Sequence, residues 1–323
     1  CALPILTTYE LDRFTFQYDK EFQFLIIATG MASQDGFDEK LPKSLVVVGG
    51  KPIIQWQLEV LAALGVTTID MVMGKSYSQP IKKTIETIHS KVDVKYFEVD
   101  DMDQLKSGVA LRMYKEWKRE QLTHCKNLVV IACDLLFDVN TLTNMINQHR
   151  TTNSYLTILA TEQKRPILKK GEKFDEEKPK DLLILNKEKR IFGMKYTNCN
   201  DTIHIPFELL DRYPVLTVVD EIQTLKTFVV RSPVLKMPFT DKLQAIHKDI
   251  LPTMIRLLHG KFGQNIYKKS IDDLFNHIPH PFEPPCMYHL QKNGMTFRIT
   301  QEAQIKKVDG MVKSNKLRLL EFN

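Results

Sequence analysis

Residues 24–52 read FLIIATGMASQDGFDEKLPKSLVVVGGKP, and this stretch decides the fold class of a chain of 323 residues. It begins with the apolar run FLIIA, which is typical of a buried parallel strand and ends at Thr29 and Gly30. Beyond a polar loop, GGKP leads into residues 52–64, whose apolar side chains recur mostly at helical spacing, and Gly65 favours a helix end. A buried strand, a turn and a helix in this order are the first unit of an α/β fold.

The same alternation of strand and helix patterns continues to residue 160. Strands are predicted over 68–73, 92–99, 127–132 and 155–160, and helices over 80–89, 107–118 and 140–149. This alternation implies βαβ units, so we predict an α/β fold with a doubly wound, mostly parallel, Rossmann-like sheet. Ligands of such sheets bind beyond the carboxyl ends of the strands, which directs attention to the residues that follow each strand.

The second half of the chain is less regular. Residues 163–190 are dense in both charges, which predicts a solvated loop or hairpin arm, the alternative being a basic docking patch. Further patterns predict strands over 182–185, 191–196, 202–205, 215–219 and 227–230, and a helix over 249–259.

The carboxyl-terminal region begins with a linker signal. Four prolines punctuate residues 270–285, and the alternation over 286–312 predicts short strands. We therefore divide the chain into an α/β domain at 20–268 and a linker with a short strand extension at 269–323.

Composition places the chain among ordinary globular proteins. Hydrophobic residues make up 43% and charged residues 26%, and a net charge of +6 is too small to indicate nucleic-acid binding by itself. The five cysteines have no CxxC spacing, which argues against a disulfide framework or a structural zinc site. Neither a membrane-spanning run nor a signal peptide pattern occurs, so a cytosolic location is expected. Because the first residue is not Met, we interpret the sequence as a fragment or processed chain.

The candidate site surrounds the end of the first strand. Gly30 in the turn, the pair Pro42 and Lys43, and the glycines before Lys51 could place backbone N–H groups and lysine side chains against a phosphate. The competing interpretation is that the glycines only form turns and that Lys43 is a solvated loop residue.

Asp134 presents a similar choice. An Asp after a parallel strand either caps the next turn or binds Mg²⁺ together with a second carboxylate, for which Asp220 and Glu221 are the downstream candidates. No HExxH, GxSxG or spaced Cys/His pattern assigns a catalytic residue.

These motifs resemble the sugar-1-phosphate nucleotidyltransferase superfamily. The matching pattern is strand-Gly, then Leu-Pro-Lys-x-Leu, then Val-x-Gly-Lys-Pro-Ile-Ile at a helix start. The resemblance implies that Pro42 and Lys43 correspond to a Pro-Lys pair whose Lys aids the phosphates. It likewise implies that Asp134 corresponds to the Mg²⁺ ligand after a central strand. Gly108, in KSGVA, falls where the superfamily contacts the base of the nucleotide.

The sequence departs from the superfamily pattern at the glycine-rich loop. The superfamily's Gly-Gly-x-Gly-x-Arg-Leu is replaced by TGMASQDGF at 29–37, which keeps Gly30 but lacks the second and third glycines and the Arg. Without these glycines the backbone cannot approach phosphates closely, and without the Arg the transition state loses a bidentate partner. We therefore expect no catalytic residue, and no cofactor beyond residual nucleotide or Mg²⁺ binding in a vestigial cleft.

Within the superfamily, three segments resemble the gamma subunits of eukaryotic translation initiation factor 2B. They are VIACDLLFDV at 130–139, HKDILPTMIRLLHGKF at 247–262 and CMYHLQKNGMTFRI at 286–299. The hexapeptide repeats of that family's β-helix are not found, so the chain is expected to be an amino-terminal portion or a truncated member.

The resemblance implies a noncatalytic subunit of the guanine-nucleotide exchange complex that acts on initiation factor 2. Its expected partners are an epsilon-like subunit, other subunits of the same complex and the GTP-binding factor, with no DNA and no membrane. The alternative is a nucleotidyltransferase that makes a nucleotide-sugar from a nucleoside triphosphate and a sugar 1-phosphate. A third function, RNA binding, is not supported, because the chain lacks the interleaved aromatic and basic residues that an RNA-binding module would need.

Overall fold

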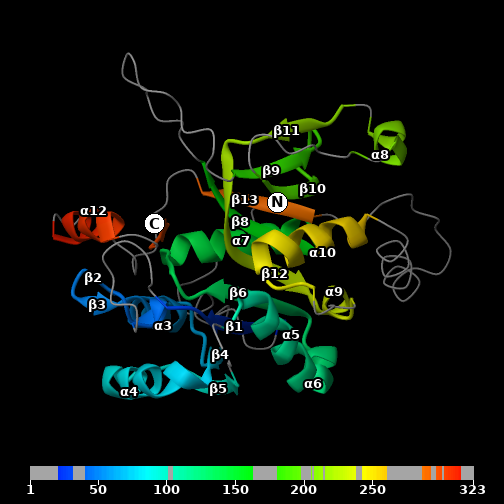
Figure 1. The fold of residues 1–323 in the computed structure, drawn as a ribbon. Coiled ribbons are helices and arrows are strands. Elements are labelled where there is room, and N and C mark those ends of the chain that lie inside the picture. The colour runs from blue at the N-terminus through cyan, green and yellow to red at the C-terminus, as the bar shows by residue number, and fades with distance from the viewer. Residues whose placement is uncertain are drawn as a thin grey trace, which may run out of the picture.

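The computed structural model describes residues 21–31, 41–100, 105–162, 180–197, 205, 207–213, 215–237, 242–259, 286–291, 296–299 and 302–313. Within these residues, seven strands form a central sheet in the order β13-β8-β12-β6-β1-β4-β5 (Figure 1). Their bounds are β1 Phe22–Ala28, β4 Thr68–Gly74, β5 Asp93–Val99, β6 Asn127–Ala132, β8 Leu156–Glu162, β12 Ile222–Arg231 and β13 Cys286–Gln291. Neighbours are parallel except at β12, which is antiparallel to β6 and β8. The predicted mostly parallel α/β sheet is confirmed.

Helices cover both faces of the sheet because successive residues of β1 point to opposite sides. Phe24 and Ile26 join a cluster with helices α3 (Ile53–Ala63), α4 (Ser78–Ile88) and α7 (Val139–Thr151). Leu25 and Ile27 join the opposite cluster, to which a second set of helices contributes. These are α5 (Ser107–Trp117), α6 (Arg119–His124), α9 (Ser232–Leu235) and α10 (Leu251–Leu258), the last preceded by the π-helical turn η4 (Ile246–Ile250).

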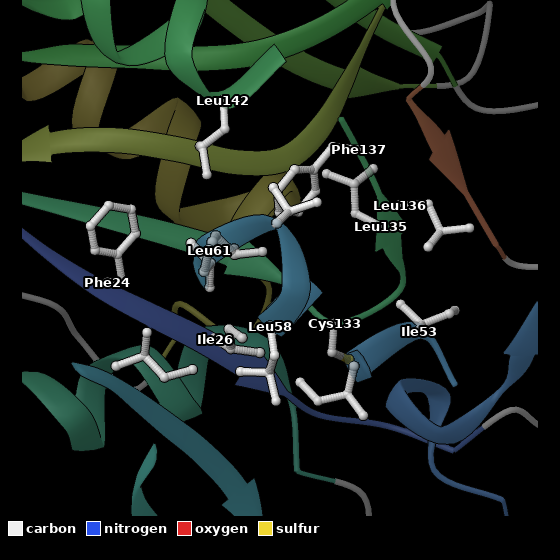
Figure 2. Packing of buried hydrophobic residues seen from close by; sticks show 14 of the residues in the cluster. Phe24, Ile26, Ile53, Leu58, Leu61, Cys133, Leu135, Leu136, Phe137 and Leu142 are labelled. Carbon is white, nitrogen blue, oxygen red and sulfur yellow. The ribbon is translucent and has the colours of Figure 1, made fainter. Parts of the chain in front are cut away.

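The first predicted unit, strand-turn-helix, is present as expected. Helix α3 starts after Pro52 and ends before Gly65, which adopts a φ of 77° that only glycine accommodates without strain. Figure 2 shows Leu58 and Leu61 of α3 packed with Ile26 of β1 and with the side chains that follow β6. This packing holds α3 against one face of the sheet, and the apolar residues among 133–137, which follow β6, pack on the same face.

Smaller elements lie at the edges. Strands β9 (Lys180–Leu185), β10 (Ile191–Thr197) and β11 (Thr217–Val219) form an antiparallel sheet in the order β10-β9-β11, near helix α8 (Phe207–Arg212). The remaining elements are the 3₁₀-helices η2 (Lys43–Leu45) and η3 (Lys75–Tyr77), the pair β2 (Val47–Val48) and β3 (Lys51–Pro52), the pair β7 (Leu135–Leu136) and β14 (Phe297–Arg298), and helix α12 (Glu302–Lys313).

The carboxyl-terminal prediction was correct for two strands and wrong beyond them. Strands β13 and β14 fall within 286–312, but residues 302–313 form helix α12 rather than short strands. Ile305 and Val308, three positions apart, both contact the core, which is a helical spacing. Strand β13 also pairs with β8 in the main sheet, while the predicted linker at 270–285 lies outside the described residues, so the division at residue 269 stays a prediction.

Two other predicted segments reach outside the described residues. Residues 163–179 of the charged segment and residues 202–204 of a predicted strand are not described. In the part of the chain that is described, no helix combines the length and the apolar character needed to cross a membrane.

Candidate functional site

The turn after β1 brings Gly30, Pro42 and Lys43 together. Gly30 adopts a φ of 86°, its carbonyl accepts a hydrogen bond from the Lys43 backbone N–H at 3.3 Å, and Met31 forms a β-bridge with Pro42. A Cβ placed on Gly30 would lie 3.6 Å from Lys43 Nζ, so the lysine side chain passes directly over the glycine. The positive φ favours glycine at this position, whereas the lysine lies at ordinary contact distance from it.

Asp134 lies just beyond the end of β6, where it was predicted, and it is paired with an arginine. The residue is only 5% exposed, and its Oδ2 accepts hydrogen bonds from Arg298 Nε at 3.1 Å and Nη2 at 3.0 Å. The backbone supports the pair, because Ile299 N–H donates to the Asp134 carbonyl at 2.8 Å and β14 pairs with β7. The carboxylate is thus held in a buried, charge-assisted contact.

Lys226 adds a second cation from β12. It has a φ of 57° and lies where the register of β12 against β8 shifts between Thr224 and Phe228. Burial and, after it, the Arg298 charge lower the pKa of Lys226 to about 8, and the Asp134 carboxylate opposes both effects. The bulge therefore turns a strand lysine toward the same charged cluster.

The cations determine the charge state of Asp134. Burial alone would raise the pKa of this carboxyl, but Arg298, then Lys226 and Lys43, hold it below its ordinary value. The neighbouring Cys133 thiol is buried, which raises its pKa to about 12, so it stays protonated and unreactive at neutral pH. The site is a carboxylate surrounded by cations.

Aromatic and polar groups border the cluster. His247 of η4 contacts Tyr196 of β10 edge-on, with ring centroids 4.4 Å apart. Burial, together with the charges of Lys226 and Arg298, lowers the pKa of His247 to about 3, so this imidazole is neutral at pH 7. Asp181 of β9 accepts hydrogen bonds from the N–H and Oγ1 of Thr224, both at 2.7 Å.

Gly108 lies at the start of α5, and its described contacts are with residues 243–244 rather than with Lys43 or Asp134. Its N–H donates to the Gln244 carbonyl at 2.9 Å, and a Cβ on it would lie 2.6 Å from the Gln244 backbone. Close packing of two backbones accounts for this glycine. Its role in nucleotide binding stays a prediction.

The donor set around Asp134 does not suit Mg²⁺. The described residues contain no group of three or more His, Cys, Asp or Glu side chains that could hold a metal ion. Asp220, proposed as a second carboxylate, pairs with Lys180 at 3.5 Å. A divalent cation needs several oxygen ligands, whereas the groups that act on Asp134 are mainly cations.

Sequence reasoning missed Arg298, Lys226 and His247. Arg298 and His247 lie in the segments 286–299 and 247–262, which were identified by resemblance, but no site role was assigned to either residue. Their convergence on Asp134 depends on contacts between distant parts of the chain, for which one sequence carries no signal.

Comparisons with known proteins agree with this architecture. The nucleotidyl transferase family model matches residues 37–167. The chain is 23% identical over 307 residues to translation initiation factor eIF2B subunit gamma of Dictyostelium discoideum, a match covering 84% of this chain and 68% of that protein. It is also 29% identical over 138 residues to the bifunctional protein GlmU of Thermoanaerobacter pseudethanolicus, covering 42% of this chain and 27% of GlmU.

Solved structures show the same fold at low sequence identity. One, the structure of a glucose-1-phosphate thymidylyltransferase of Bacillus anthracis in complex with a sucrose, has a TM-score of 0.57 and 13% identity, and the match covers 90% of this chain and 95% of that chain. Another, HddC of Yersinia pseudotuberculosis complexed with GMP-PN, has a TM-score of 0.55 and 12% identity over 89% of this chain and 98% of its own. The expected resemblances to nucleotidyltransferases and to the gamma-subunit family are confirmed.

Proposed function

We propose that this chain, which contains a nucleotidyltransferase-like domain and resembles eIF2B subunit gamma over 84% of its length, is a noncatalytic subunit of a guanine-nucleotide exchange complex. The complex acts on translation initiation factor 2 in the cytosol. The chain contributes subunit assembly and binding of the factor. Its partners are an epsilon-like subunit, the other subunits of the complex and the GTP-binding factor.

The observation that carries the noncatalytic part is the ion pair between Asp134 and Arg298. Nucleotidyl transfer requires the triphosphate charge to be neutralised, usually by a metal ion held on carboxylates. Here the carboxylate after β6 is bound instead by an internal guanidinium at 3.0 Å, and Lys226 and Lys43 add further positive charge. An internal salt bridge that occupies the carboxylate supports a structural rather than a catalytic use of the domain.

Exposed apolar side chains support the assembly part. Phe207, Leu210, Val215 and Val218 are 81%, 39%, 50% and 46% exposed, and they lie in or near α8 and β11. Large apolar side chains left in water are typical of surfaces that a partner covers. We therefore place the contact with a partner subunit on this part of the molecule.

Co-purification tests the assembly part. The tagged chain, co-expressed with the epsilon-like subunit of its own organism, is expected to elute with it as one species. The double variant Phe207→Ser, Val218→Ser is expected to reduce the amount of partner retained. Val47→Ser is the matched control, because Val47 is 54% exposed and lies on β2. Failure of the unaltered chain to retain any subunit of the complex would contradict the proposal.

A pyrophosphate-release assay tests the noncatalytic part. The chain is incubated with Mg²⁺, a nucleoside triphosphate and a sugar 1-phosphate, with an active nucleotidyltransferase as the positive control. We expect no release above background. Release that saturates with substrate and disappears in Lys43→Ala would replace this proposal with the nucleotidyltransferase alternative, which rests on the family model over 37–167.

A further inference from the structure

A cavity of about 280 Å³ is lined by residues of α5, α6 and α9 and the residue that follows α9. Figure 1 shows the position of these three helices in the fold. Ser232, in its wall, donates its backbone N–H to the Lys126 carbonyl at 3.0 Å, immediately before β6 begins. Asp134 follows the other end of β6. Since the strand has six residues, and a strand rises roughly 3.3 Å per residue, the two places are about 20 Å apart. The cavity is therefore separate from the candidate cleft.

The charge of the cavity is predominantly positive. The described residues that line it include Lys115, Arg119 and Lys236 against one carboxylate, Glu116. Lys115 is half-buried and its Nζ donates to the Met237 carbonyl at 2.6 Å, which fixes the position of this ammonium. Arg119 and Lys236 are exposed at the mouth. Burial lowers the pKa of Lys115, Glu116 opposes this shift, and the Arg119 charge adds to it. An anion bound beside Lys115 would favour its charged form.

The floor of the cavity is apolar and rigid. Leu122 and Leu235 line it and are 4% and 3% exposed, and both belong to the core cluster on that face of the sheet. Ser232 Oγ donates to the Leu122 carbonyl, which ties α9 to α6 beneath the cavity. A ligand that fits this arrangement has an anionic head at the mouth and a small organic body over the leucines.

We propose that this cavity binds a small phosphomonoester. The phosphoryl group lies between Arg119 and Lys236, within reach of Lys115, and the organic part covers Leu122 and Leu235. A phosphomonoester carries close to two negative charges at neutral pH, which matches three cations offset by one carboxylate. Drug-sized ligands occupy pockets of roughly 300–1,000 Å³, so a cavity of about 280 Å³ suits a small metabolite rather than a nucleotide.

Isothermal titration of the full chain tests the proposal, with glycerol 3-phosphate, inorganic phosphate and glycerol as probes. We expect saturable binding of glycerol 3-phosphate, weaker binding of inorganic phosphate, which lacks the organic part, and no binding of glycerol. Arg119→Gln and Lys236→Gln should each weaken binding of glycerol 3-phosphate by about tenfold, the loss expected for one charge-assisted hydrogen bond.

Matched variants separate a specific site from general charge effects. Arg256→Gln on α10 and Lys83→Gln on α4 remove exposed cations elsewhere and should leave the affinity unchanged. Lys43→Gln should also bind normally, because Lys43 belongs to the cleft. Equal thermal unfolding midpoints show that the variants are folded. The proposal is overturned if no probe binds, if the α10 and α4 variants lose as much affinity as the cavity variants, or if Lys43→Gln abolishes binding.

Discussion

At the scale of single residues, Asp134 shows how a neighbour decides the chemistry of a carboxylate. The residue type and its place after β6 would suit a metal ligand, but Arg298, 164 positions along the chain, binds its Oδ2. Lys226 and Lys43 also help to keep the carboxyl ionised. The chain thereby supplies its own counter-charge to this carboxylate.

Removing the guanidinium should therefore destabilise the fold. Arg298→Gln leaves Asp134 buried without its partner, and we expect the free energy of unfolding to fall by about 3 kcal/mol, as for other broken buried ion pairs. Urea denaturation followed by circular dichroism measures this. In the Arg298→Gln, Asp134→Asn double variant, most of the loss should be recovered, because position 134 no longer carries a buried charge without its guanidinium partner. A loss in the single variant that the second substitution does not reduce would argue against the ion pair as its cause.

The burial of His149 predicts that the free energy of unfolding depends on pH. It is 1% exposed, with its ring nitrogens 2.9 Å from Thr157 Oγ1 and 3.2 Å from Asn127 Oδ1. Burial lowers its pKa to about 3, whereas an exposed His titrates near ~6.5. Between these values the unfolded chain binds more protons than the folded chain, so the free energy of unfolding falls as the pH decreases from about 6.5.

Replacing this histidine should flatten that dependence. In His149→Gln, the decrease in the free energy of unfolding between pH 7 and pH 5 should be smaller than in the unaltered chain by about 2 kcal/mol. Urea titrations at the two pH values give the comparison. The same decrease in both proteins would show that His149 does not titrate on unfolding.

At the scale of elements, α5 is held by backbone contact with the segment before η4. The Gly108 N–H bonds to Gln244, and Ser107 Oγ accepts from the Ile246 N–H at 3.2 Å. Because a Cβ on Gly108 would lie 2.6 Å from the Gln244 backbone, the glycine lets α5 approach this segment closely. The sequence-based interpretation of Gly108 as a base contact did not anticipate this packing requirement.

A pair of glycine substitutions checks this requirement. Gly108→Ala should lower the free energy of unfolding by about 2 kcal/mol, because the added methyl group forces the two backbones apart. Gly310→Ala in α12 is the control, since nothing lies within 4 Å of the added Cβ, and a gain of about 1 kcal/mol is expected there from helix propensity. Thermal unfolding of both variants distinguishes them. Equal stability of Gly108→Ala and the unaltered chain would rule out the steric explanation.

At the scale of the whole molecule, the main sheet depends on the carboxyl-terminal segment. Strand β13 covers the edge of β8, whose residues Leu156 and Ile158 are fully buried. Strand β14 places Arg298 on Asp134, and α12 approaches the turn after β2, where Gly49 N–H donates to Asp309 at 2.6 Å. Through these contacts, β13, β14 and α12 are all joined to the α/β domain.

Truncation at the predicted boundary tests how far the two regions are independent. A chain limited to 20–268 would expose the β8 edge and leave Asp134 unpaired, so we expect loss of soluble monomer and an apolar edge prone to association. Size-exclusion chromatography beside the 323-residue chain measures this. A monomeric truncated protein with an unchanged unfolding midpoint would establish 269–323 as a separate extension.

Much of the fold could be predicted from the sequence because its signals are local. The runs that became β1 and β6 are short and apolar, and Pro52 and Gly65 mark the limits of α3. Residues 302–313 were predicted as short strands but form a helix, whose core contacts at Ile305 and Val308 have helical spacing. The places of Gly30, Lys43 and Asp134 beyond strand ends were also predictable, since parallel strands end at a common edge.

By itself, therefore, the sequence determined the alternating strands and helices, the parallel sheet and the resemblance to nucleotidyltransferases. Local periodicity and short motifs are enough for these. The pairing of Arg298 with Asp134, the inward turn of Lys226 and the cavity beside Lys115 were decided only by the tertiary structure. Each depends on side chains that are distant in sequence, and these side chains interact only when folding brings them together.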